Sequence, residues 1–260
     1  MTKKVYISKR VQDAWHMRYS LGNQKLYATY ESTGLKTAAF DLPAGFTCPA
    51  ANICLSYAMP DGRVKLGKDA KFTCYAAKTA AMYPATKRMQ SDNLKKVNGF
   101  IRDYGIDCTA DMIASDIESS GFGIVRIHSS GDMFSNDYTK VWLRVAEQCE
   151  SVLFFGYTKV YMSYRMLNDV RFPNLAFAFS IGSKQDAWIK DSDVTCTVVT
   201  PEYDLYPYNR IRYGVMVENQ FCDTFGNRHD VICHDHDNPF AYGVDLHYIL
   251  NRESFGIALH

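Results

Sequence analysis

Apolar residues in the second half of the chain occur in short unbroken runs rather than in alternation with polar residues. Residues 123–128, 151–157, 175–181 and 194–200 are such runs, and stretches with helical spacing lie between several of them. Strands without period-two alternation are typical of a parallel sheet that is buried on both faces. The pattern predicts an α/β fold in which about seven βα-like units form a full or partial parallel (β/α) barrel.

The first 47 residues differ from this pattern. Short extended pieces at 5–7, 25–30 and 38–40 are separated by turn-forming residues, which predicts a short β-rich N-terminal segment. A cysteine-rich loop at 48–83 follows, and residues 84–260 carry the βα repeats. A chain of 260 residues divided in this way is expected to form a single domain.

Helical spacing is clearest after Pro84. Apolar residues from Met89 to Ile101 lie on one face of a helix that is predicted to run through about Tyr104. A second helix, capped by Asn136 or Asp137, is predicted to run to Cys149. Further helices are expected at residues 161–168, 185–191 and 240–250.

Composition narrows the functional classes. The 29 basic and 28 acidic side chains nearly cancel, and apolar residues make up 47% of the chain. This excludes a disordered protein and one that binds nucleic acid through bulk positive charge, but leaves a local basic groove open. We expect no membrane span and no signal peptide, hence a cytoplasmic protein, because no long apolar segment occurs. In a reducing cytoplasm, cysteines at chosen spacings are more often metal or cluster ligands than disulfides.

Three of the eight cysteines lie in the cysteine-rich loop. Five residues separate Cys48 from Cys54, and nineteen separate Cys54 from Cys74. Three converging thiolates can hold an iron–sulfur cluster and leave one iron open, whereas a fourth ligand would complete a zinc site. The spacing alone leaves a third interpretation open, in which the three are buried as small apolar side chains.

Polar side chains gather where the predicted strands end. In a parallel sheet, ligand-binding and catalytic residues lie at this edge, at the carboxyl ends of the strands. Arg126 and His128 project from one strand, and Gly131 in the turn that follows permits close backbone approach to a ligand. Asp132 can bind an ammonium or ribose hydroxyl or act as a base, and Lys159 can neutralise a carboxylate or phosphate. The alternatives are that Asp132 only shapes a turn and that Lys159 is solvated.

Two constellations near the C-terminus remain ambiguous. Within the run 232–237, residues 233–236 offer four metal-binding side chains, but alternate residues of a strand face opposite sides, so all four cannot bind one ion on a strand. A polar loop after a strand is the favoured interpretation, and the alternative is that Cys233 is a fourth ligand beside the N-terminal cysteines. Residues 203–213 interleave Tyr and Arg, as in a surface that stacks bases or in a half-buried loop. Phosphate-binding glycine fingerprints and a nucleophile elbow are absent, which argues against nucleotide hydrolases, Rossmann enzymes and serine hydrolases.

Several motifs together resemble the gene product eighty-eight family of tailed phages. They are the Cys-Pro-x4-Cys segment at 48–54, Cys-Tyr-Ala from Cys74, Arg-x-His-x-Ser-Gly-Asp from Arg126, and Tyr-Thr-Lys at 157–159. The Cys-Tyr-Ala and Ser-Gly-Asp motifs are also similar, more distantly, to radical-SAM-like barrels. Two features depart from that pattern: residues 55–73 look like an insertion, and the C-terminal cysteines are sparse.

The resemblance implies a phage protein acting in the host cytoplasm, with a [4Fe–4S] cluster on Cys48, Cys54 and Cys74. It places Gly131 and Asp132 near bound S-adenosylmethionine. In the leading hypothesis Arg126 also binds this cofactor, and Asp132, His128 and Lys159 are the catalytic residues for a small-molecule, nucleotide or nucleic-acid substrate. A second hypothesis is a zinc-stabilised module that binds nucleic acid or a host protein without catalysis. A third is a metal-free base-modifying enzyme in which Asp132 is the base or nucleophile.

Overall fold

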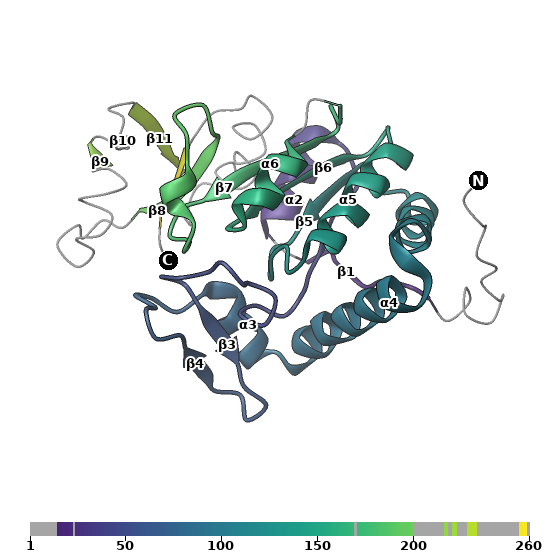
Figure 1. Ribbon diagram of the computed structural model, residues 1–260, viewed down its shortest axis with the longest axis horizontal. Helices are drawn as coiled ribbons and strands as arrows, with labels where there is room; N and C mark the ends of the chain where they lie inside the picture. Colours follow the sequence, from purple (N-terminus) through teal and green to yellow (C-terminus); the bar gives the residue numbers. More distant parts are fainter. Residues whose placement is uncertain are drawn as a thin grey trace.

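A mostly parallel sheet with helices packed against it forms the centre of the molecule (Figure 1). The computed structural model describes residues 15–22, 24–168 and 171–199, and beyond them only four strand segments. In this part of the chain the sheet contains ten strands. In spatial order they are β1 (Tyr19–Ser20), β2 (Thr37–Phe40), β5 (Ile124–Ile127), β6 (Leu153–Thr158), β7 (Leu175–Ser180), β8 (Thr195–Val199), β12 (Phe255–Ala258), β11 (Arg228–Ile232), β10 (Gln220–Cys222) and β9 (Met216–Val217).

Parallel pairing runs without interruption from β2 through β5, β6, β7, β8 and β12 to β11. Antiparallel pairs flank this region, β1 with β2 at one end and β10 with β11 and β9 at the other. Every residue of β2 and β5 is buried, which explains why these strands lack polar alternation. The mixed α/β fold with a mostly parallel sheet is therefore confirmed, and closure of the sheet into a barrel stays a prediction.

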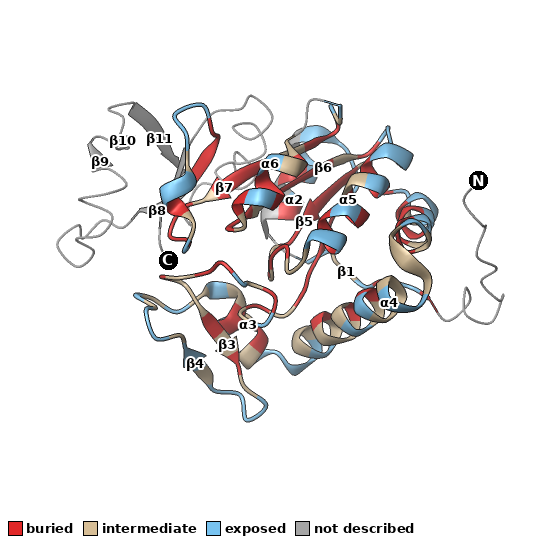
Figure 2. Cartoon of the chain, viewed as in Figure 1, coloured by how far each residue is buried: buried red, intermediate tan, exposed pale blue. Residues whose placement is uncertain are grey.

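The main core lies between the sheet and helices α5 (Asn136–Gln148) and α4 (Pro84–Ser120) (Figure 2). On α5 the residues Tyr138, Val141, Trp142 and Val145 recur at helical spacing, and all four are fully buried. Burying each such side chain contributes about 1.5–3 kcal/mol. The helix begins as predicted, although its N-cap is Ser135, whose hydroxyl accepts a hydrogen bond from the Tyr138 amide at 3.2 Å.

Helix α4 is longer than predicted. Its regular first part ends at Tyr104, as expected, because Gly105 has a positive φ of 85° that breaks the helical geometry. A second helical stretch then continues to Ser120 and buries Ile113 and Ile117 against the core. The weak apolar periodicity of this second stretch explains why the sequence pattern did not predict it.

Other predictions need correction. Residues 25–30 are helical rather than extended, within α2 (Gln24–Thr33), which buries Leu26 and Thr29 on one face. The helix expected at 185–191 is only the short 3-10 turn η1 (Asp186–Trp188). Helix α6 (Tyr161–Leu167) is confirmed. The pieces predicted at 5–7 and 240–250 lie outside the described residues.

The cysteine-rich segment forms a small lobe beside the sheet (Figure 1). It contains the antiparallel pair β3 (Ser56–Ala58) and β4 (Val64–Leu66), followed by helix α3 (Tyr75–Met82), which leads into α4. None of the helices in the described ranges combines the length and apolarity needed to cross a membrane.

Candidate functional site

The carboxyl ends of β2, β5, β6 and β7 meet at one edge of the sheet, because these strands are neighbours and parallel. Asp41 follows β2, the segment His128–Asp132 follows β5, Lys159 follows β6, and Ser183 lies just after β7. All of these residues are buried except Ser129 and Gly131, which are half-exposed. The fold thus brings most of the predicted site residues to one edge of the sheet, as expected for the carboxyl ends of neighbouring parallel strands.

Asp132 is the centre of this edge and is only 4% exposed. Its Oδ1 accepts hydrogen bonds from the Met133 amide at 2.7 Å and the Thr158 hydroxyl at 2.6 Å, and Oδ2 accepts one from the Lys159 amide at 2.9 Å. Burial raises the pKa of the Asp132 carboxyl, while these three hydrogen bonds oppose the rise. The carboxylate therefore ties the end of β5 to the end of β6, which favours a positioning role over that of a base contacting substrate.

Gly131 lets the Ser-Gly-Asp turn pack against the segment that leads into the cysteine-rich loop. Its φ is +92°, and an added Cβ would lie 2.7 Å from Leu42 Cβ and 2.7 Å from Thr47 Oγ1. Two hydrogen bonds hold the segments together, since the Leu42 amide donates to the Ser130 carbonyl and the Ser130 hydroxyl to the Leu42 carbonyl, each at 2.8 Å. Protein atoms fill the space that the sequence suggested for a ligand, and a cofactor contact by Gly131 stays a prediction.

Asp41 is a site residue that the sequence analysis missed. Its Oδ1 accepts hydrogen bonds from the amides of Ser129 and Ser130 at 2.7 and 3.0 Å, and its Oδ2 accepts one from the Ser20 hydroxyl at 2.7 Å. Burial raises the pKa of the Asp41 carboxyl. Because Asp41 directly follows the strand at 38–40, the strand-end rule could have identified it.

Lys159 is buried with its ammonium group among carbonyl and hydroxyl oxygens. Its Nζ donates to the Ser180 carbonyl at 3.1 Å, the Ser180 hydroxyl at 3.0 Å and the Ile181 carbonyl at 2.6 Å. These contacts make Lys159 a link between β6 and β7 rather than a solvated side chain. Burial raises the pKa of both Asp132 and Cys54, and the positive charge of Lys159 opposes part of that rise.

His128 has an unusual conformation. It has a positive φ of 72°, which is uncommon for a residue with a side chain, and its ring is buried. Its Nε2 and the Tyr138 hydroxyl are hydrogen-bonded at 2.8 Å, while Nδ1 has no partner among the described residues. Burial lowers the pKa of His128 from 6.5 to about 3, and the charge of Arg126 adds to this effect, so the imidazole is neutral at pH 7. The Arg126 guanidinium itself lies 5.1 Å from the centre of the Tyr157 ring.

The cysteine-rich loop is fastened to the same edge. Amides of Asn52 and Ile53 donate to the Gly182 carbonyl at 3.3 Å each, and the Lys184 amide donates to the Ala50 carbonyl at 2.9 Å. The Ser183 hydroxyl donates to the Lys159 carbonyl at 2.7 Å. The loop between Cys48 and Cys54 therefore lies over the ends of β6 and β7.

Ser56 joins the second and third cysteines across the insertion. Its hydroxyl donates to the Cys54 carbonyl at 3.1 Å and accepts from the Cys74 amide at 3.0 Å. Cys48 is held separately, with its Sγ accepting from the Gly45 amide at 3.4 Å. The backbones of Cys54 and Cys74, which are separated by nineteen residues in the sequence, are thus joined by one side chain.

The three thiols lie within electrostatic range of one another. Burial raises the pKa of the Cys48 and Cys54 thiols, and Asp132 and the neighbouring cysteines, Cys74 among them, raise both further. All three are half-buried and free of disulfides. Within the described ranges, no three His, Cys, Asp or Glu side chains are arranged so that they could hold a metal ion. Cys233, together with residues 203–213 and 233–237, lies outside those ranges.

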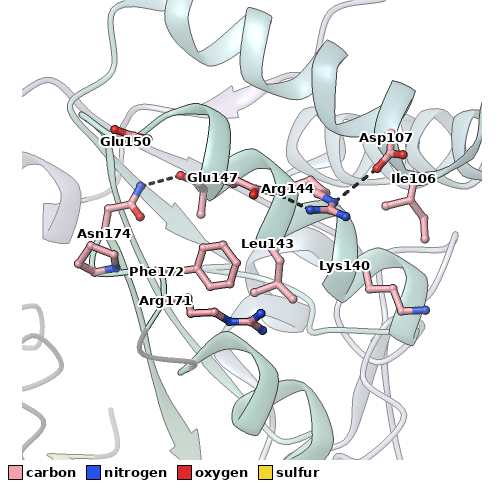
Figure 3. A pocket seen from close by; sticks show the side chains of 12 residues that line it. Ile106, Asp107, Lys140, Leu143, Arg144, Glu147, Glu150, Arg171, Phe172 and Asn174 are labelled. Atoms are coloured by element: carbon pink, nitrogen blue, oxygen red, sulfur yellow. Dashed lines mark hydrogen bonds and ion pairs between the residues drawn. The ribbon is translucent and has the colours of Figure 1, made fainter. Parts of the chain in front are cut away.

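A separate hollow of about 990 Å³ lies between α4, α5 and the segment before β7 (Figure 3). None of the predicted site residues lines it. Its central cation, Arg144, pairs with Asp107 at 3.5 Å and with Glu147 at 2.7 Å, as the dashed lines show. The charges around Arg144 are therefore largely neutralised within the protein.

Comparison with known proteins gives a family. The model of the family described as Gene product 88 matches residues 13–247, which include the cysteine-rich loop and all the strand ends described above. The chain is 28% identical over 111 residues to the Gene 88 protein of Mycobacterium phage L5. That alignment covers 41% of this chain and 46% of the relative, so the similarity spans about half of the relative's length.

No solved structure matches the chain significantly. The family match confirms the resemblance drawn from the cysteine and Ser-Gly-Asp motifs, whereas the likeness to radical-SAM-like barrels stays a prediction. With the family model covering most of its length and a phage protein among its relatives, the chain is a phage protein that belongs to the Gene product 88 family.

Proposed function

We propose that Cys48, Cys54 and Cys74 hold an iron–sulfur cluster, and that the protein is an enzyme with radical-SAM-like chemistry on a nucleotide or nucleic acid. One observation carries the proposal. Ser56 joins the backbone of Cys54 to that of Cys74, both cysteines raise the pKa of the Cys48 thiol, and the segment from Cys48 to Cys54 covers the ends of the parallel strands. Thiolates are the ligands that iron–sulfur clusters use, and three of them leave one iron open.

The donor set fits such a group in its chemistry. In the chain without a metal, burial keeps the Cys48 and Cys54 thiols protonated, because it raises the pKa of each. Coordination replaces those protons with a cation, and the side chains must then close around it. The Lys159 ammonium lies near enough to Cys54 to offset part of the negative charge that three thiolates bring.

The remaining residues have roles that their contacts support. Asp132 positions the turn and the Lys159 backbone, and Gly131 keeps that turn against the segment that leads into the cysteine-rich loop. His128 presents a neutral imidazole whose Nδ1 lacks a partner among the described residues, and such an atom is suited to a ligand hydrogen bond. In a radical-SAM-like enzyme the cluster supplies one electron to bound S-adenosylmethionine.

The test is reconstitution with iron and sulfide under exclusion of oxygen. Wild-type protein should take up both and absorb visible light, and Cys48→Ser, Cys54→Ser and Cys74→Ser should each reduce uptake sharply. Cys108→Ser is the matched control, since Cys108 lies on α4 outside the site and its replacement should change nothing.

Two results would contradict the proposal. One is a wild-type protein that remains colourless and takes up no iron. The other is equal uptake by all four cysteine variants, which would show that the bound iron is unrelated to this loop. Binding of one zinc without sulfide would favour the non-catalytic zinc module over the iron–sulfur enzyme.

A further inference from the structure

The insertion between Cys54 and Cys74 forms a hairpin with two different faces. In the register of β3 and β4, Tyr57 lies opposite Lys65, and Ser56 lies opposite Leu66. Because neighbouring residues of a strand point to opposite faces, Tyr57 and Lys65 share one face. Ser56 is on the other face, where it bonds to the backbone of both cysteines.

Two aromatic rings mark the face of Tyr57. The Phe46 ring lies 5.1 Å from the Tyr57 ring, at an interplanar angle of 72°. Phe46 is nevertheless 61% exposed. Close backbone packing fixes this arrangement, because a Cβ on Gly45 would lie 2.3 Å from the Ser56 carbonyl oxygen. The loop that presents Phe46 is the one that carries Cys48, and its Gly45 amide donates to Cys48 Sγ.

The hairpin, helix α3 and the first residues of α4 are strongly basic. Residues 56–88 contain seven Lys or Arg and two Asp, although the whole chain has a net charge of only +1. Arg63 is paired with Asp61 at 2.6 Å. Four exposed lysines have no ion pair among the described residues, namely Lys65, Lys68, Lys71 and Lys78. Figure 2 shows β4 and the loops around it as largely exposed.

We propose that the face formed by Phe46, Tyr57 and Lys65, the hairpin face, binds single-stranded nucleic acid. Exposed rings can stack on unpaired bases, and unpaired lysines neutralise phosphates. Val64 and Leu66 alternate with Lys65 and point away from this face, so it offers rings and charge rather than an aliphatic surface for lipid.

The inference names single-stranded nucleic acid as the substrate class of the proposed enzyme. Binding to the hairpin face does not depend on the proposed function, whereas any reaction on the bound strand rests on it. The hairpin occupies the insertion that separates this chain from the compact cysteine pattern of radical-SAM-like proteins. A strand on the hairpin face would pass beside Phe46, two residues from Cys48 in the chain. The insertion would thus add a binding surface next to the cysteine site.

The test is fluorescence anisotropy with a labelled oligothymidylate of about 15 nucleotides, a length within the usual site size of single-strand binding proteins. We expect Phe46→Ala and Tyr57→Ala each to weaken binding about tenfold. Lys65→Ala should lower the slope of log affinity against log salt by about 0.7. The matched controls are Tyr27→Ala on α2 and Lys140→Ala on α5, which should bind like the wild type.

Circular dichroism of each variant separates loss of binding from loss of folding. Absence of binding by the folded wild type overturns the inference. Equal binding by the hairpin-face variants and the controls also overturns it. So does a result in which the hairpin-face substitutions weaken binding to vesicles of phosphatidylserine and phosphatidylcholine more than binding to the oligonucleotide.

The same assay distinguishes this inference from the proposed function. A variant with Cys48, Cys54 and Cys74 all replaced by Ser should lose iron but keep oligonucleotide binding. Phe46→Ala should weaken oligonucleotide binding about tenfold but keep iron. Failure of only one of these activities in the wild type identifies which of the two proposals is wrong.

Discussion

Replacing Gly131 by Ala tests whether the Ser-Gly-Asp turn is packed against Leu42 and Thr47, in the segment that leads into the cysteine-rich loop. At a φ of +92° any side chain strains the backbone, which costs about 1–2 kcal/mol. The new methyl would also lie 2.7 Å from Leu42 Cβ and Thr47 Oγ1, and such overpacking costs about 1–3 kcal/mol. We therefore expect Gly131→Ala to lower the free energy of unfolding by about 2–5 kcal/mol.

Gly34→Ala is the matched control for the cost of placing a side chain on backbone with a positive φ. Gly34 has a φ of +70°, but nothing lies within 4 Å of its added Cβ, so only about 1–2 kcal/mol should be lost. Urea unfolding followed by circular dichroism measures both variants against the wild type. Equal losses for Gly131→Ala and Gly34→Ala would refute the packing of the turn on this segment. Iron uptake should also fall in Gly131→Ala alone, because Thr47 precedes Cys48 directly.

Two further predictions concern titratable groups of the site. His128 has its pKa lowered from 6.5 to about 3, so the stability that the neutral ring contributes is complete above 6.5 and is lost as the pH falls toward 3. Unfolding by urea should show the wild type losing about 2 kcal/mol more than His128→Asn between pH 7 and pH 5, and parallel losses would contradict this. Lys159→Met should raise the pKa of Cys54 and slow its alkylation in metal-free protein, about tenfold for each pKa unit. Mass spectrometry with Cys108 as internal reference measures that rate, and an unchanged ratio of Cys54 to Cys108 labelling would refute the charge effect.

The parallel sheet was predictable because burial on both faces leaves a direct trace in the sequence. Strands such as β5 and β7 contain almost no polar alternation, and the helix at 136–148 has a regular apolar face. Helix α2 was not predictable in the same way, since residues 25–30 have the mixed polar and aromatic composition of a strand. Its conformation depends on burying Leu26 and Thr29, which is decided by tertiary packing.

The location of the site was predictable from topology, but its internal contacts were not. The strand-end rule placed His128, Asp132 and Lys159 at one edge. It could not show that the Asp132 carboxylate accepts three hydrogen bonds from its own chain. The same rule could have identified Asp41 at the end of its strand, but not its hydrogen bond to the Ser129 amide, which spans 88 positions.

The central claim is that Cys48, Cys54 and Cys74 hold one metal-centred group in this protein. Elemental analysis of protein purified without oxygen, with assay of acid-labile sulfide, tests it most directly. We expect iron and sulfide in the wild type and in Cys108→Ser, and their loss in each of the three site variants. Wild-type protein that contains neither iron nor sulfide and whose three thiols all react with an alkylating reagent would contradict it.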